Sequence, residues 1–310
     1  MIFQSIHSEE KRKVLFEKIK QKPKHASIVN TICKNLLCEV EGEARRKVNA
    51  ILLHPEIRKH YLKYLHSINN RRKVKGLLYL KDAKILPDGE IQRVVKLLDH
   101  KLHYLAHASA LAILGSAKSQ LHKSTIIHMC NRSEDCKYTL VELFWEFWKN
   151  EFVSKESKNK CFQVLLSSED ISLEVKGLLV RVISSLDEHH FAIYFHDILK
   201  FTLSSEYGRT RHSFLASLIT AIAKSDYAIA EREIMEAYSI ENIEVKLSVV
   251  KALWKFKTNF AINHLSKIYL ESTDSIKKEI SYLVKDDKEM SRQILISGIT
   301  TKYVEKFEGE

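Results

Sequence analysis

Few residues in this 310-residue chain are spaced for chemistry. His103 and His107 lie four residues apart, with Asp99 and His100 just before them. On a helix this spacing can place two imidazoles on one metal ion. No cysteine or carboxylate set completes the site, and the surrounding residues are typical of a packing helix. We therefore expect no metal ion and no cofactor.

A second candidate is a pair of carboxylates among aromatic residues. Glu142 and Glu146 are four residues apart and flank Phe144 and Trp145. Such a pair can share a helix face and do acid–base work, although paired surface carboxylates are usually solvated. The chain has no glycine-rich phosphate loop and no nucleophile elbow. We expect no catalytic residues and predict that the chain is not an enzyme.

Positive charge is confined to the first third of the chain. Residues 1–100 contain 22 Lys and Arg but 11 Asp and Glu, whereas the rest is balanced, and the net charge is +11. This asymmetry predicts a local acidic partner. The candidate basic patch comprises Arg45, Arg46, Lys47, Arg58, Lys59, Arg71, Arg72, Lys73 and Lys75. Protein, anionic lipid or nucleic acid could each bind there, and we favour protein.

The elements that position these residues follow from three prolines. Pro23, Pro55 and Pro87 stand 32 residues apart, and each precedes a helical stretch. Proline is tolerated there because the amide that it lacks has no partner in the first turn of a helix. The period predicts repeated two-helix units. With only eight glycines in the chain, β-rich and dinucleotide-binding folds are disfavoured.

The second helix of each unit shows a common apolar pattern. In residues 244–256 its expected core positions are Val245, Ser248, Val249, Ala252, Leu253 and Phe256. The frame predicts second helices that start near residues 69, 103, 136, 175, 210, 245 and 276. First helices are expected near 119–130, 155–167, 188–203, 227–239 and 259–270. An acidic residue followed two positions later by a basic one, as in Glu244 and Lys246, is expected to link neighbouring units.

Second helices line the concave face of a stack of helix pairs. Positions outside the apolar stripe are therefore expected to face a groove, and they hold Tyr138, Trp145, Arg181, His212, Lys251 and Trp254. Trp145 and Trp254 occupy the same position in the frame. Since exposed tryptophan is enriched at interaction hot spots, we predict that they anchor a bound peptide or helix, although packing on neighbouring helices is the alternative.

The copies at Glu244–Phe256 and Glu174–Leu186, together with Ile85–Gly115, resemble the HEAT and HEAT-like repeat families. The resemblance covers nearly the whole chain and is specific for fold. It implies an all-α, right-handed α-solenoid of about eight HEAT-like helix pairs. We expect a basic N-terminal helix at residues 1–22, the repeat solenoid at 23–286, and a C-terminal capping helix and tail at 287–310.

The function favoured by these features is a scaffold or adaptor that mediates protein–protein interaction. Its basic N-terminal third would bind an acidic partner or an anionic membrane surface. The alternative is a nucleic-acid-binding protein, or one similar to the HEAT-like alkylpurine DNA glycosylases, with Glu142 or Glu146 as the acid. The Trp-Asp-x-x-Asp motif of those enzymes has no match here, and neither do the His-Glu pairs of HEAT-like iron hydroxylases.

The five cysteines, Cys33, Cys38, Cys130, Cys136 and Cys161, are odd in number and irregular in spacing. This pattern argues against a disulfide framework and favours a reducing compartment, with most of the cysteines in the core. No window of 18 consecutive apolar residues occurs, and the first residues lack the apolar stretch of a secretory signal. We expect a cytoplasmic protein, with a peripheral position at the inner face of a membrane as the alternative.

Overall fold

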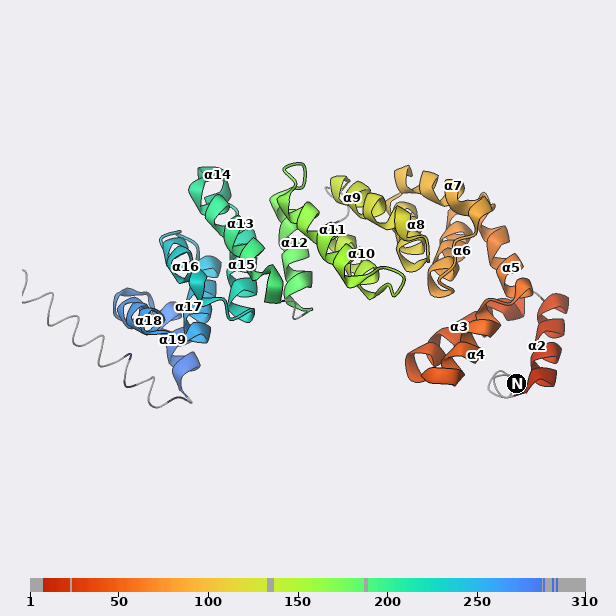
Figure 1. Cartoon of the computed structure of the whole chain (residues 1–310), viewed down its shortest axis with the longest axis horizontal. Coiled ribbons are helices and arrows are strands. Elements are labelled where there is room, and N and C mark those ends of the chain that lie inside the picture. The colour runs from red at the N-terminus through yellow and green to blue at the C-terminus, as the bar shows by residue number, and fades with distance from the viewer. Residues whose placement is uncertain are drawn as a thin grey trace, which may run out of the picture. The chain divides into compact units, whose positions relative to one another are not determined.

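The computed structural model describes residues 8–22, 24–132, 137–186 and 189–285, with the single residues 287, 292 and 294. Every regular element in these ranges is a helix (Figure 1). The chain divides into two compact units, residues 1–161 and 162–310, here called unit 1 and unit 2. The prediction of an all-α fold built from helix pairs is confirmed. The expected boundaries at residues 22 and 286 stay predictions, and the capping segment at 287–310 lies almost wholly outside the described residues.

Unit 1 opens with a single helix and continues as helix pairs. Its helices are α2 (Glu9–Gln21), α3 (Lys24–Glu39), α4 (Gly42–Leu52), α5 (Pro55–Leu65), α6 (Asn70–Asp82), α7 (Asp88–Lys96), α8 (His103–Gly115), α9 (His122–Asn131) and α10 (Lys137–Lys149). The second helices α6, α8 and α10 pack side by side in that order. Because α8 is covered on both sides, it is buried almost continuously from residue 105 to 115.

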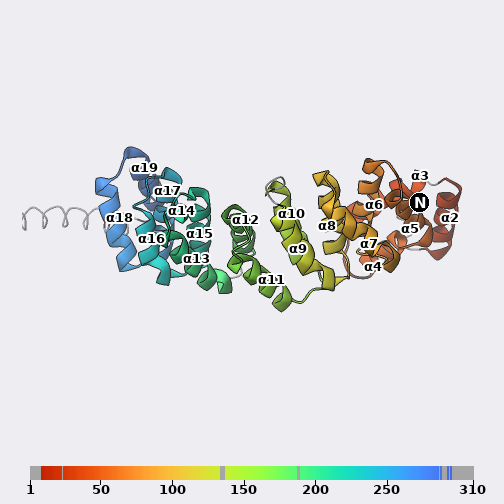
Figure 2. The ribbon, with the colours of Figure 1, turned by 90° about the horizontal axis from the view of Figure 1, so that it is seen from above.

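Unit 2 repeats the same construction. Its helices are α12 (Leu173–Ser184), α13 (Ala192–Ser204), α14 (Glu206–Arg209), α15 (His212–Lys224), α16 (Glu231–Ala237), α17 (Ile243–Phe256), α18 (Asn259–Glu271) and α19 (Asp274–Val284), and α11 (Lys155–Ser167) crosses the unit boundary. The second helices α12, α15, α17 and α19 stack in succession (Figure 2). Their starts lie within three residues of the expected ones, so the frame is confirmed.

Local signals explain where the helices begin and end. Pro55 occupies the first turn of α5, as expected, while Pro23 lies outside the described residues. The Asn242 side chain caps α17 by accepting a hydrogen bond from the Val245 amide. The left-handed backbone of Lys257 (φ 52°) then ends that helix.

The expected apolar stripe forms the core of each layer. In α17, Val245, Val249 and Phe256 are buried. Ser248 is only partly buried, and its hydroxyl donates a hydrogen bond to the Glu244 carbonyl. Cys33, Cys130 and Cys161 are buried free thiols, and the Cys38 and Cys136 side chains lie outside the described part of the chain. The packing therefore follows the helical period of the sequence.

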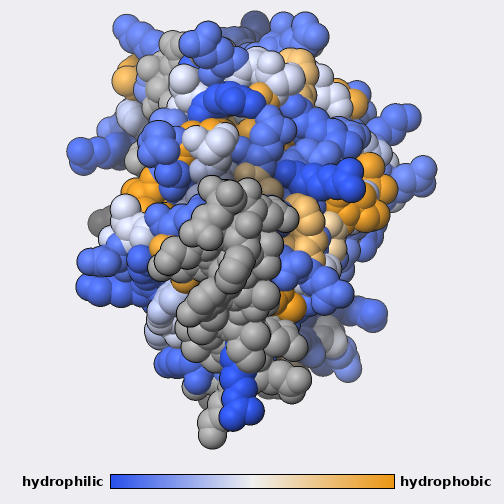
Figure 3. All heavy atoms as spheres, turned by 90° about the vertical axis from the view of Figure 1, so that its left-hand side faces the viewer, coloured by the Kyte–Doolittle hydropathy of each residue, from blue (hydrophilic) through white to orange (hydrophobic). Residues whose placement is uncertain are grey.

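Figure 3 shows one side of the molecule, where hydrophilic residues predominate and hydrophobic ones form separate patches. Across the described ranges, none of the helices combines the length and apolarity that a bilayer crossing requires.

Candidate binding surfaces

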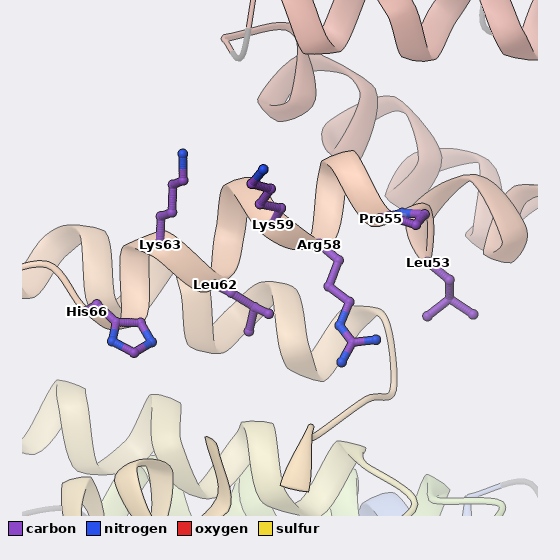
Figure 4. Close-up of a pocket in the computed structure, with 7 residues that line it drawn as sticks. All are labelled: Leu53, Pro55, Arg58, Lys59, Leu62, Lys63 and His66. Atoms are coloured by element: carbon purple, nitrogen blue, oxygen red, sulfur yellow. The ribbon is translucent and has the colours of Figure 1, made fainter. Parts of the chain in front are cut away.

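A groove runs along the exposed face of α5. It has a volume of about 470 Å³ and is lined by Leu53, Pro55, Arg58, Lys59, Leu62, Lys63 and His66. Figure 4 shows Lys59 and Lys63 projecting together from one side of the helix, and Arg58 and Leu62 from another. This arrangement follows from helical geometry, since residues four apart share a face. The groove thus combines apolar contact area with three cationic side chains.

The opposite face of α5 holds the helix in place. Ile57, Tyr61 and Leu65 are buried, and the Tyr61 ring stacks on Tyr79 of α6 with centroids 4.4 Å apart. The Tyr79 hydroxyl donates a 2.7 Å hydrogen bond to the Leu52 carbonyl at the end of α4. Burial raises the pKa of Tyr79 strongly, so its hydroxyl stays protonated. The groove is therefore built on a packed element with fixed orientation.

The cationic side chains of the groove outnumber the acids of their helix, on which Glu56 is the one carboxylate. Among the described residues, neither an ion pair nor a side-chain hydrogen bond joins Arg58, Lys59 or Lys63 to a carboxylate. Elsewhere in unit 1, Lys34 is paired with Asp82 at 2.7 Å, and at the groove's end the His66 ring lies 3.0 Å from Glu90. Positive charge is thus locally in excess along α5.

The start of α6 extends this charge. Arg71, Arg72, Lys73 and Lys75 lie in its first half, and its first turn contains no acidic residue. Cations at the positive end of a helix are unfavourable, each by roughly 0.3–1 kcal/mol. Within the described ranges, no carboxylate pairs with these four residues. The turn that joins α5 to α6 also presents Ile68, whose side chain is 96% exposed.

We call the seven cations on these two helices the α5–α6 basic surface: Arg58, Lys59, Lys63, Arg71, Arg72, Lys73 and Lys75. The sequence predicted six of them as members of the basic patch, and Lys63 was not among them. This prediction missed the apolar residues Leu53 and Leu62. Leu62 lies one helical turn after Arg58, so helical spacing could have revealed it, whereas Leu53 lies in the turn between α4 and α5 and no helical spacing points to it.

The other predicted basic residues, Arg45, Arg46 and Lys47, lie on α4 and do not line this groove. Lys47 is paired with Glu43 at 2.7 Å, which lowers the pKa of Glu43 through a hydrogen bond and charge attraction. Arg45 and Arg46 are exposed. A single basic face that joins α4 to α5 and α6 stays a prediction.

The predicted residues on second helices differ in their surroundings. Trp145 and Trp254 are both half-buried, and a lysine lies over each ring, Lys149 at 5.4 Å and Lys257 at 4.7 Å from the centroid. Their partial exposure leaves the expected anchoring role open as a prediction. The side chain of Tyr138, another predicted groove residue on α10, lies outside the described residues.

In unit 2 the predicted residues are held by neighbouring helices. Lys251 on α17 lies 3.3 Å from Glu279 of α19, and His212 on α15 shares a 3.1 Å hydrogen bond with Asn242. Arg181 on α12 is exposed and lines a second groove, of about 200 Å³, across α12, α15 and α17. The other residues of this groove are Ser184, Ala216, Ser217, Thr220, Lys224, Glu244 and Ser248.

The acids considered for catalysis, Glu142 and Glu146 on α10, are paired with basic side chains of α6 and α8. Glu142 lies 2.8 Å from His107 and 3.6 Å from Lys81, and Glu146 lies 3.2 Å from Lys81. Burial alone would raise the pKa of Glu142, but His107 and Lys81 together lower it. A carboxylate held ionised in this way is a poor proton donor at neutral pH.

Histidines 103 and 107 do not assemble a metal site in the described ranges, where no three His, Cys, Asp or Glu side chains converge as metal ligands would. His107 is engaged with Glu142, and the His100 Nδ1 atom accepts a 3.0 Å hydrogen bond from the Leu102 amide. These side chains therefore serve local hydrogen bonding.

Comparison with known proteins places the fold only. No protein-family model matches the chain, and neither does any curated protein. One similar solved structure is that of human deoxyhypusine hydroxylase in complex with glycerol, at 12% identity and a TM-score of 0.36, over 84% of this chain and 96% of that one. Another is an engineered protein, at 15% identity and a TM-score of 0.31, over 86% of this chain and 71% of that one.

The comparison corrects one expectation. The sequence predicted that the chain is not an enzyme, and that prediction is wrong as it stands, because a solved structure of similar fold is that of an enzyme. At 12% identity the likeness assigns no activity to this chain. The fold itself shows that the chain is an all-helical repeat protein.

Proposed function

We propose that this chain is a HEAT-like scaffold or adaptor protein that binds an acidic segment of another protein through the α5–α6 basic surface. The observation that supports this proposal is the groove on α5, where Arg58, Lys59 and Lys63 surround apolar side chains and lack acidic partners among the described residues. The expected cytoplasmic location stays a prediction.

The composition of the groove favours a protein over nucleic acid. Leu53 is 43% exposed beside the cations, and Leu62 lies between Arg58 and Lys63 on the same helix. A nucleic-acid backbone offers phosphates but no apolar side chains to such a surface. An amphipathic segment that carries Glu and Leu matches both kinds of contact.

The proposal is tested by fluorescence anisotropy with a labelled acidic amphipathic helical peptide of Glu and Leu residues. A matched peptide with Gln in place of Glu reports on charge. We expect binding of the acidic peptide to weaken as salt rises, because exposed charges are screened. The triple variant Arg58→Glu, Lys59→Glu, Lys63→Glu should weaken binding at least about tenfold, which corresponds to about 1.4 kcal/mol.

The control variant Arg232→Glu, Lys255→Glu, Lys278→Glu changes one arginine and two lysines that are exposed on unit 2. It should bind the peptide as the parent protein does. Labelled duplex DNA and vesicles that contain phosphatidylserine complete the experiment. Equal loss of binding in both triple variants would contradict the site, and tighter binding to DNA or vesicles than to peptide would contradict a protein partner.

A further inference from the structure

The groove in unit 2 has the size of a side-chain pocket. Its volume of about 200 Å³ corresponds to roughly seven water molecules. Typical cofactor and drug sites are larger, about 300–1,000 Å³. The groove is shared by three successive second helices, α12, α15 and α17, which pack against one another. Its size therefore suits a single residue of a partner chain.

Arg181 is preoriented at this groove. Its Nε atom donates to the Ser217 hydroxyl at 2.8 Å, and its Nη2 atom donates to the Ser213 hydroxyl at 3.0 Å. Both serines lie on α15, one turn apart, so they fix one edge of the planar guanidinium. Since a guanidinium has five N–H donors, three remain, and the outer edge can bind a carboxylate in a bidentate manner.

No acid of the described residues occupies that edge. Arg181 has no carboxylate partner there, and neither does Lys224, the second cation of the groove. By contrast, the other arginine of this interface, Arg211, lies 2.6 Å from Glu174. An arginine held by two hydroxyls and left without an acid is a binding element that an external oxyanion can complete.

Two other hydroxyl groups of the groove donate their protons within their own helices, whereas the Ser184 hydroxyl has no hydrogen-bond partner in the described part of the chain. The Thr220 hydroxyl donates to the Ala216 carbonyl at 2.7 Å, and the Ser248 hydroxyl donates to the Glu244 carbonyl at 2.9 Å. Their oxygen lone pairs are therefore the groups available to a ligand. The Glu244 carboxylate on α17 adds a charged acceptor. A fitting ligand must offer an anion and N–H donors together.

We propose that this groove binds an acidic side chain of a partner peptide, with the carboxylate on Arg181 and Lys224 and main-chain N–H groups toward α17. Phosphate is the poorer fit, because it offers no N–H donors to the hydrogen-bond acceptors on α17. The site involves unit 2 only and does not depend on the α5–α6 basic surface.

The test is an NMR titration of the full chain with N-acetyl-glutamate N-methylamide, in which the side-chain Nε–H of Arg181 and the amide of Thr220 are followed. We expect saturable shifts of both signals. The neutral analogue N-acetyl-glutamine N-methylamide should bind roughly tenfold more weakly, since it loses the charge-assisted contacts. Inorganic phosphate should also bind more weakly than the glutamate probe.

Two variants identify the site. Arg181→Met should abolish the saturable shift of Thr220, whereas Arg232→Met, an exposed arginine on α16, should leave it unchanged. The double variant Ser213→Ala, Ser217→Ala keeps the charge of Arg181 but frees its side chain, so binding should weaken severalfold. Equal binding of the two acetylated probes, tighter binding of phosphate, or an unchanged response in Arg181→Met would each overturn the proposal.

Discussion

The pKa of His60 on α5 responds to the electrostatic field of the basic groove. It is half-buried, and its ring lies 4.9 Å from that of Tyr64. Burial lowers the pKa of His60, and the charge of Lys63 lowers it further. The imidazole is therefore mainly neutral at pH 7, and the positive charge of the groove comes from arginine and lysine.

Replacement of Lys63 by glutamine tests this field directly. We expect Lys63→Gln to raise the pKa of His60, because one of the two causes of its depression is removed. An NMR titration of the His60 ring protons measures the change. Lys59→Gln is the control from the same helix. An unchanged or lower pKa of His60 in Lys63→Gln would contradict the assigned field.

At the scale of the element, α6 presents a conflict between stability and binding. Arg71 and Arg72 in its first turn oppose the positive end of the helix, although Asn69 caps it by accepting hydrogen bonds from the Arg71 and Arg72 amides at 2.9 and 3.3 Å. A charge pattern that costs stability is expected where a surface is used for binding.

Arg72→Glu should therefore act in opposite directions on two measurements. We expect the free energy of unfolding to rise by roughly 0.3–1 kcal/mol, because an acid replaces a base in the first turn of α6. Affinity for the acidic peptide should fall in the same variant. Urea denaturation and peptide anisotropy give the two values, and Arg72→Gln should lie between the parent and Arg72→Glu in both. A loss of stability in Arg72→Glu would contradict the assigned role of the helix dipole.

The packing of α5 on α6 depends on one glycine. A methyl group at Gly76 would lie 3.0 Å from both the Tyr61 carbonyl oxygen and the Leu65 Cδ2 atom. Gly76→Ala should therefore separate the two helices and destabilise the protein by about 1–3 kcal/mol. Gly89→Ala, at a position with open space around it, is the matched control for thermal unfolding. Equal effects of the two substitutions would contradict the close approach.

These elements also show what the sequence could and could not predict. The helical frame was readable because each second helix repeats a stripe such as Val245, Val249 and Phe256, which is a local pattern. The residues of the α5 groove were only partly predictable from the sequence. The runs of basic residues pointed to Arg58 and Lys59, but the exposed Leu53 lies outside those runs. The second groove depends on which helix face meets which neighbour. Thr220 and Glu244 are brought together only by packing, so no local pattern reveals them.

The link expected between units was also only partly predictable. Glu174 does contact the next pair, but its partner is Arg211, at 2.6 Å, rather than a lysine of the acid–base pair. Lys246 instead lies 2.9 Å from Glu241, in the turn before its own helix. Side-chain length and the local turn decide between such partners, and the two-residue spacing does not encode either.

At the scale of the whole molecule, buried histidines couple stability to pH. Burial lowers the pKa of His54, His60, His122 and His264 below the ordinary value. A lowered pKa in the folded state means that the unfolded chain binds protons more readily below about pH 6.5. The stability from these histidines is thus present above that pH and is lost as the pH falls through their folded-state pKa values.

We therefore expect the unfolding temperature to decrease as the pH is lowered from about 7 to 5. His122, which is 1% exposed, should contribute to that slope, so His122→Gln should flatten it whatever its effect on stability at pH 7. Differential scanning calorimetry across this range provides the measurement, with His103→Gln, an exposed site on α8, as the control. A slope that is unchanged in His122→Gln would contradict its role.

The modification rates of the buried thiols of unit 1 report how often the helices around them separate. Burial raises the pKa of Cys33 and Cys130 to about 12 and that of Cys161 to about 11, so hardly any thiolate exists in the closed state. Alkylating reagents react with thiolates, and at these positions they must wait until the surrounding helices part. The modification rate of each cysteine, read by mass spectrometry, then reports how often its own layer comes apart.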